Sequence, residues 1–95
     1  MKNPPMALKY EATKAFWKQF DKLSPQQQEV ARGKFKVFKK DPFASSLRPH
    51  KINRLSALIG KTVFAIDLEG DLRAAFYRDA DVIKTVSIGT HDIYK

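Results

Sequence analysis

The sequence contains no cysteine, which excludes a disulfide framework and any zinc site with cysteine ligands. Its two histidines, His50 and His91, lie far apart in the chain, so we expect neither a structural metal site nor a cofactor. No apolar run approaches the roughly 20 residues that span a bilayer, and residues 1–6 lack the apolar stretch of a secretion signal. We therefore predict a cytoplasmic protein with no membrane partner.

Acidic residues are also scarce. Ten Asp and Glu face eighteen Lys and Arg, which gives a formal net charge of +8 and favours a polyanionic partner. The stretch between Arg32 and Lys61 holds nine basic residues and a single acid, Asp41. A solvated helix face explains part of such a run. Because the run continues past the end of the expected helix, it favours a binding surface.

The 95 residues, 43% of them hydrophobic, are enough for one domain, 1–95, with a packed core. Apolar side chains recur at helical spacing from about residue 11. A second helix begins at Ser24-Pro25, where serine can cap the helix, proline suits its first position and Gln27 can complete a capping box. This helix is expected to run to residue 39 or 40, because Asp41-Pro42 ends it.

The second half of the chain changes to the alternation of strands. Residues 62–68, 72–77 and 82–88 are predicted strands with short turns between them, and short turns require antiparallel pairing. A further strand is plausible near residues 47–55, and a short edge strand at residues 6–10. The predicted fold is therefore α+β, with an N-terminal helix hairpin packed on one face of a three- to four-stranded antiparallel sheet.

Arg73 interrupts the apolar pattern of the strand at 72–77. Leu72, Ala74 and Phe76 point to one face, so Arg73 stands on the other, beside small Ala75, with room for a ligand. A guanidinium matches phosphate geometry and keeps its charge at physiological pH. The alternative is that Arg73 only pairs with an acid at position 67 or 69 across the hairpin.

Three further residues can move protons or stack on a base. His91 follows the last strand and suits general acid–base catalysis near neutral pH, although a histidine near a terminus is often only a surface residue. Tyr94 offers a phenol or a stacking face, or else closes the end of the core. His50 stands among cations, which disfavour its protonated form, so it could serve as a neutral base. Alternatively, the segment that carries His50 is only a charged edge strand, without a catalytic role.

Together these groups supply what cleavage of an RNA phosphodiester requires. A base removes the proton of the 2′-hydroxyl, a cation offsets the charge of the phosphorane, and an acid protonates the leaving 5′-oxygen. This route needs no metal ion, which fits a chain without cysteine.

Three segments, residues 47–52, 71–76 and 88–94, resemble the RelE/ParE toxin superfamily of type II toxin–antitoxin systems, with the YafQ/RelE-like ribonuclease branch as the nearest match. The resemblance spans about residues 11–95. It implies a helix hairpin on an antiparallel sheet, and an endoribonuclease that cuts mRNA at the ribosome by 2′-hydroxyl attack. It also implies a cognate antitoxin as protein partner, and contact with operator DNA only through the antitoxin complex.

The resemblance also assigns roles. Arg73 matches the phosphate-binding arginine, His91 the C-terminal catalytic histidine, Tyr94 the aromatic residue near the end, and His50 a further catalytic histidine. The basic residues expected to contact RNA are Arg48, Lys51, Arg54, Lys36 and Lys40. Two other functions remain: a ParE-like inhibitor of gyrase without catalysis, which has no need of the His91/Tyr94 ending, and a weakly active nucleic-acid-binding relative.

Overall fold

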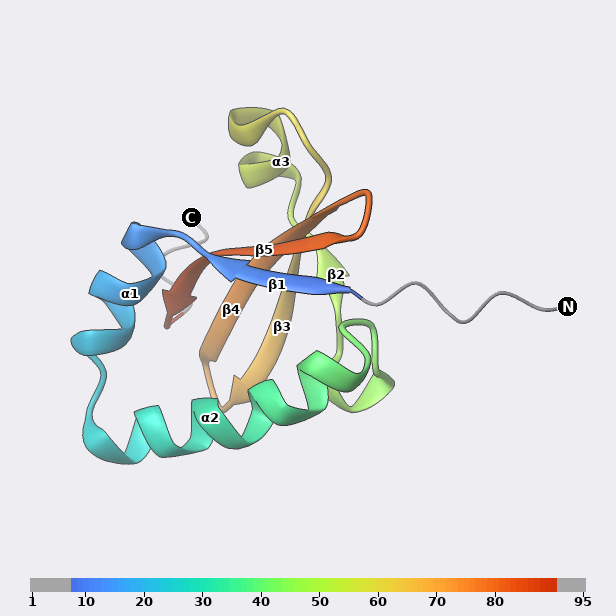
Figure 1. Ribbon diagram of the computed structural model, residues 1–95. Coiled ribbons are helices and arrows are strands. Elements are labelled where there is room, and N and C mark those ends of the chain that lie inside the picture. The colour runs from blue at the N-terminus through green and yellow to red at the C-terminus, as the bar shows by residue number, and fades with distance from the viewer. Residues whose placement is uncertain (1–7, 91–95) are drawn as a thin grey trace, which may run out of the picture.

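The computed structural model describes residues 8–90 of the chain, which form a sheet with helices on both of its faces (Figure 1). The first half holds β1 (Lys9–Ala12), α1 (Lys14–Asp21), α2 (Pro25–Lys40) and a 3₁₀ turn, η1 (Ser45–Leu47). The second half holds β2 (His50–Lys51), α3 (Asn53–Ile59), β3 (Val63–Glu69), β4 (Leu72–Asp79) and β5 (Val82–Gly89). None of the helices in the described part of the chain is long and apolar enough to cross a membrane.

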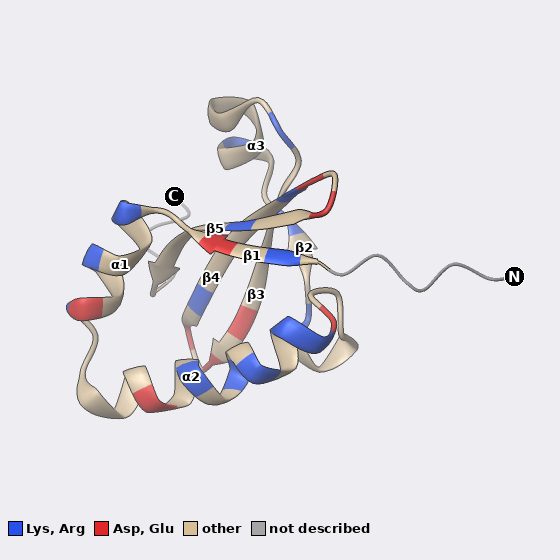
Figure 2. Ribbon diagram, viewed as in Figure 1, with Lys and Arg blue, Asp and Glu red and all other residues tan. Residues whose placement is uncertain are grey.

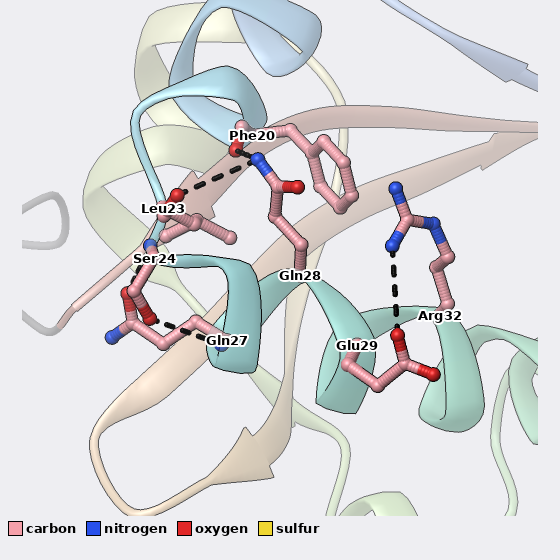
Figure 3. Close-up of polar contacts among 7 residues, drawn as sticks. All are labelled: Phe20, Leu23, Ser24, Gln27, Gln28, Glu29 and Arg32. Atoms are coloured by element: carbon pink, nitrogen blue, oxygen red, sulfur yellow. Dashed lines mark hydrogen bonds and ion pairs between the residues drawn. The ribbon is translucent and has the colours of Figure 1, made fainter.

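The second helix of the hairpin begins and ends where its sequence signals predict, whereas the first, expected from about residue 11, begins at Lys14 because residues 9–12 form strand β1. The Ser24 hydroxyl accepts a hydrogen bond from the Gln27 backbone N–H at 3.1 Å, and the Gln27 side-chain oxygen accepts one from the Ser24 N–H at 3.0 Å (Figure 3). This capping box, with Pro25 in the first turn, satisfies backbone donors that a helix start leaves free. The helix ends at Lys40, immediately before the predicted stop at Asp41.

The sheet has five strands in the order β1-β5-β4-β3-β2, one more than the upper end of the predicted three to four. Strands β5, β4, β3 and β2 pair antiparallel, as expected, but the edge strand β1 pairs parallel with β5. A parallel neighbour needs a long connection. Here the helix hairpin provides part of it, because α1 and α2 follow β1 in the sequence and precede all the other strands. The edge strand predicted at residues 6–10 therefore exists, displaced to Lys9–Ala12.

The strand predicted near residues 47–55 is mostly wrong. Only His50 and Lys51 pair with β3, and the chain then forms the helix α3. Ser56 holds this turn in place, because its hydroxyl donates to the Ile52 carbonyl at 2.7 Å and accepts from the Val63 N–H at 2.8 Å. Those two bonds join the start of α3 to the start of β3.

Apolar side chains fill both faces of the sheet. The main core lies between the sheet and the hairpin α1/α2 and includes Phe16, Phe38 and Phe76, which are at most 4% exposed. A smaller cluster on the second face contains Ile52, Val63, Ala65 and Ala75, with Leu55 of α3 packed against it. Near α3, this cluster therefore covers the second face of the sheet. The part of the same face that carries residues 67 and 73 lies outside the cluster.

Candidate functional site

Strand register places Asp67 and Arg73 together on the second face of the sheet. Asp67 of β3 is the cross-strand partner of Arg73 of β4, and Arg73 is in turn the partner of Gly89 of β5. Directly opposed side chains point to the same face. His50 of β2 lies opposite Ala65, two residues before Asp67, and so reaches the same face from the sheet edge.

Asp67 is the centre of this group. Its Oδ1 accepts a hydrogen bond from Arg73 Nε at 2.8 Å, and its Oδ2 lies 3.7 Å from Arg48 Nε. The side chains of Asp67 and Arg73 are 23% and 29% exposed, whereas Arg48 is 80% exposed. One carboxylate therefore stands between two guanidinium groups, and the three side chains together carry one positive charge.

The pairing of Arg73 with Asp67 is the alternative that the sequence left open for this arginine. The hydrogen bond to Asp67 engages one of the five N–H groups of the guanidinium, on its Nε side. It fixes the orientation of a side chain that stays partly open to solvent. The expected free space beside Ala75 is absent, because Ala75 is fully buried in the cluster with Ile52 and Val63.

Arg48 reaches Asp67 through an unusual backbone conformation. Its φ of 52° is left-handed, which is uncommon for a residue other than glycine. Arg48 ends the 3₁₀ turn η1, and its N–H donates to the Ser45 carbonyl at 3.0 Å. Backbone conformations of this kind gather at functional sites. Here the conformation turns the chain from η1 into the edge strand β2.

The Arg48 carbonyl also orients His50. It lies 3.1 Å from His50 Nδ1, and because a carbonyl can only accept, Nδ1 carries the proton in this contact. In the neutral ring the lone pair is then on Nε2, the nitrogen that can take up a proton. His50 is exposed, so a ligand can approach it. We call Arg48, His50, Asp67 and Arg73 the arginine cluster.

The other predicted site residues are distributed over the molecule. Arg54 belongs to α3, on the same face as the arginine cluster. Lys51 lies opposite Phe64, whose ring packs on the main core, so it points to the other face. Lys36 and Lys40 belong to α2, across the sheet from Arg73. The remaining two predicted residues, His91 and Tyr94, lie outside the described residues.

Sequence reasoning missed the central position of Asp67, which it named only as an alternative partner of Arg73. The one available signal was its place in a strand of otherwise apolar residues, in register with Arg73 across a tight turn. Within residues 8–90, no group of three or more His, Cys, Asp or Glu side chains could hold a metal ion. Two guanidinium groups and an imidazole on one face of the sheet have the chemistry of an anion-binding site.

The sequence matches none of the protein-family models and none of the curated proteins with which it was compared. Solved structures do match. They include the archaeal RelE–RelB complex from Pyrococcus horikoshii OT3, with 14% identity over 90% of this chain and 96% of that chain and a TM-score of 0.68. The YoeB dimer from Staphylococcus aureus has 13% identity over 90% and 99% of the two chains, with a TM-score of 0.64.

The E. coli DinJ–YafQ complex is similar to the same degree, with 13% identity over 90% of this chain and 96% of that chain and a TM-score of 0.62. These similarities extend over almost the whole length of each chain. They confirm the predicted α+β fold and identify it as the fold of the RelE, YoeB and YafQ structures.

Proposed function

We propose that this chain is the toxin of a type II toxin–antitoxin system and acts as a ribosome-associated endoribonuclease on mRNA, without a metal ion. The observation that carries the proposal is the arginine cluster. Two guanidinium groups and an oriented imidazole share one face of the sheet, in a fold common to RelE, YoeB and YafQ structures.

In the proposed reaction, Arg73 and Arg48 bind the scissile phosphate and offset the charge that grows on the phosphorane. His91 is the principal acid–base group. It follows Gly89, the cross-strand partner of Arg73, by two residues. Tyr94 stacks on or positions a base.

A base, His50 Nε2 or His91, takes the proton of the 2′-hydroxyl as the 2′-oxygen attacks phosphorus. The other histidine, protonated, gives its proton to the 5′-oxygen as the P–O5′ bond breaks. The products are a 2′,3′-cyclic phosphate and a 5′-hydroxyl. The cation needed for charge stabilisation is a fixed arginine, so the reaction uses no metal ion.

The proposed partners are a cognate antitoxin, the ribosome and mRNA, with operator DNA bound only through the antitoxin complex. RelE–RelB and DinJ–YafQ are both described as complexes, which supports a protein partner for this fold. Arg54 lies on α3, on the same face of the sheet as the arginine cluster, and is proposed to contact RNA together with Arg48.

The test is cleavage of an mRNA by the purified protein, with and without ribosomes. A general acid–base group typically contributes about 10²–10⁴-fold, so His91→Ala should lose at least about 100-fold in rate with an unchanged circular dichroism spectrum. A fully active variant would remove His91 from the mechanism. If the unaltered protein cleaves no RNA but its induction triggers a DNA damage response, the gyrase-inhibitor alternative replaces the proposal.

A further inference from the structure

The end of strand β5 is held from outside the sheet by the helix hairpin. Beyond Thr85, β5 has the strand β4 on one side only, because β1 ends at Ala12, opposite Thr85, in the described part of the chain. The helix α1 lies beside this end of β5 instead (Figure 1). Backbone groups at a strand edge need hydrogen-bond partners, and here they must come from α1.

Two side chains of the hairpin supply these partners. The Ile88 backbone N–H donates a hydrogen bond to Gln19 Oε1 at 3.0 Å, across 69 positions of the sequence. The Thr13 hydroxyl donates to the Val86 carbonyl at 3.2 Å and accepts from the Phe16 N–H at 3.1 Å, as the cap of α1. The two bonds reach β5 at positions two residues apart. We call Thr13 and Gln19 the hairpin clasp.

β5 needs this support because its pairing with β4 is irregular at the same point. The register shifts between Ala75 and Phe76 of β4, which leaves Val86 as an extra residue in β5. A bulge of this kind interrupts the ladder and bends the strand. The short segment after the bulge pairs with β4 as far as Gly89, which lies opposite Arg73. The hairpin clasp therefore holds β5 where its own ladder is weakest.

This end of β5 leads directly to the proposed chemistry. β5 ends at Gly89, the partner of Arg73, and His91 follows Ile88 by three residues in the sequence. The position of the last residues of β5 thus sets the point from which the segment that carries His91 begins. A displacement of about 1 Å at a reacting group can cost about 100-fold in rate.

We propose that Gln19 is a positioning residue of the ribonuclease reaction and acts through His91. The inference rests on the proposed function, because it takes His91 as the principal acid–base group. An apolar side chain at position 19 would fill similar space but would leave the Ile88 N–H without its acceptor. The strand end could then regain a partner only by moving away from α1 toward water.

The hairpin clasp uses neutral groups, which separates its effect from phosphate binding. Residues 85–89 contain no Lys, Arg, Asp or Glu, although α1 itself carries Lys14, Lys18 and Asp21 (Figure 2). Bonds between neutral groups depend little on salt, whereas contacts with phosphates weaken as salt rises. Loss of the Gln19 bond should therefore lower kcat and leave both the KM for RNA and its salt dependence unchanged.

The test replaces Gln19 by Met, which keeps the length of the side chain and removes the acceptor. We expect kcat for mRNA cleavage to fall about 10- to 100-fold, with KM within about twofold of the unaltered protein. Gln19→Glu keeps an acceptor oxygen at the same position, so its kcat should stay within about threefold of the unaltered protein. Equal losses of kcat in both variants would overturn the proposal.

Gln28→Met is the matched control. It makes the same chemical change on α2, where the Gln28 amide donates to the Phe20 and Leu23 carbonyls at 3.1 and 3.4 Å (Figure 3). These bonds stabilise the hairpin without touching β5. The control should therefore change kcat by less than about twofold, and a loss as large as that of Gln19→Met would reduce the effect to hairpin stability.

A double variant tests whether Gln19 acts through His91. When two residues act as a unit, removing the second costs little once the first is gone. Gln19→Met in a His91→Ala background should therefore change kcat by less than about threefold. A reduction as large as in the single variant would show that Gln19 acts by another route, and the proposal would be wrong.

Amide hydrogen exchange of Ile88 tests the hairpin clasp without RNA. Exchange should accelerate at least about tenfold in Gln19→Met and stay nearly the same in Gln28→Met, because only the first variant loses the acceptor of this N–H. If the unaltered protein cleaves RNA and Gln19→Met keeps its kcat, the positioning role fails and the ribonuclease proposal stands. If the unaltered protein cleaves no RNA, both proposals fail, and faster exchange of Ile88 would confirm the hydrogen bond alone.

Discussion

Replacing Asp67 by Asn should strengthen the binding of RNA. The substitution removes the one carboxylate between Arg48 and Arg73 and keeps the shape of the side chain. The local charge then rises from one positive charge to two. A phosphate held by Arg73 is attracted more strongly once this neighbouring negative charge is gone.

The magnitude follows from the geometry of the arginine cluster. The hydrogen bond from Arg73 to Asp67 is 2.8 Å long, and a guanidinium–phosphate contact adds roughly 2.8 Å, so carboxylate and phosphate would lie about 6 Å apart. Two unit charges at that distance repel by about 0.7 kcal/mol in bulk water and by about 2.8 kcal/mol at an effective dielectric constant of ~20. With Asp67 at 23% exposure, we expect a gain of about 1 kcal/mol, or about fivefold in affinity.

The assay is fluorescence anisotropy with an RNA whose 2′-hydroxyls are methylated, so that binding is measured without cleavage, over a series of salt concentrations. Asp79→Asn is the control, because Asp79 lies on β4, the strand of Arg73, and pairs with Lys61 at 3.4 Å at the opposite end of that strand. It changes the net charge equally. An equal gain in RNA affinity in both variants would mean that the effect comes from the net charge alone. Weaker RNA binding by Asp67→Asn would mean that the carboxylate acts mainly by orienting Arg73.

Three further predictions concern single residues. Arg73→Gln should weaken binding of the same RNA about tenfold and Arg73→Lys less, because lysine keeps the charge but loses the planar fork; unchanged affinity in Arg73→Gln would exclude a phosphate contact. Phe38→Ala should lower the free energy of unfolding by about 3–5 kcal/mol in urea denaturation, since Phe38 is 1% exposed and packs on Phe76 at 4.9 Å; a loss below about 1 kcal/mol would contradict this core. Ser24→Ala should cost about 1 kcal/mol in the same assay through loss of the helix cap, and no loss would mean that the capping box contributes nothing.

Local signals in the sequence predicted the hairpin and the three long strands well. The start of α2 depends on Ser24, Pro25 and Gln27, which act within one turn of helix, and its end depends on Asp41-Pro42. Alternation gave the strands at 62–68, 72–77 and 82–88; in the structure the first is shifted by one residue, and the other two extend by two residues and by one. Each of these signals is contained in a few neighbouring residues.

Two elements lack such local signals, so strand β1 was predicted two to three residues too early and helix α3 was predicted as a strand. Strand β1 is only four residues long and is held by pairing with β5, about 70 residues away. The Tyr10 hydroxyl anchors it further, by donating to the Lys39 carbonyl at 2.8 Å. Burial raises the pKa of Tyr10, and the charge of Asp41 adds to this effect, so the phenol stays a donor. Helix α3 in turn depends on Ser56, which ties it to the start of β3.

The long basic run shows most clearly what a linear sequence cannot convey. Read along the chain, the nine cations between Arg32 and Lys61 suggest one surface. In the fold, α2 carries the first part of the run on one side of the sheet, while the turn at Arg48 brings Arg48 to the face of Arg73, where α3 places Arg54 as well. The sheet lies between the two groups. The run therefore supplies two separate cationic surfaces, the anion site at Arg73 and the cations of α2, and charge reversal on one side should leave binding on the other side intact.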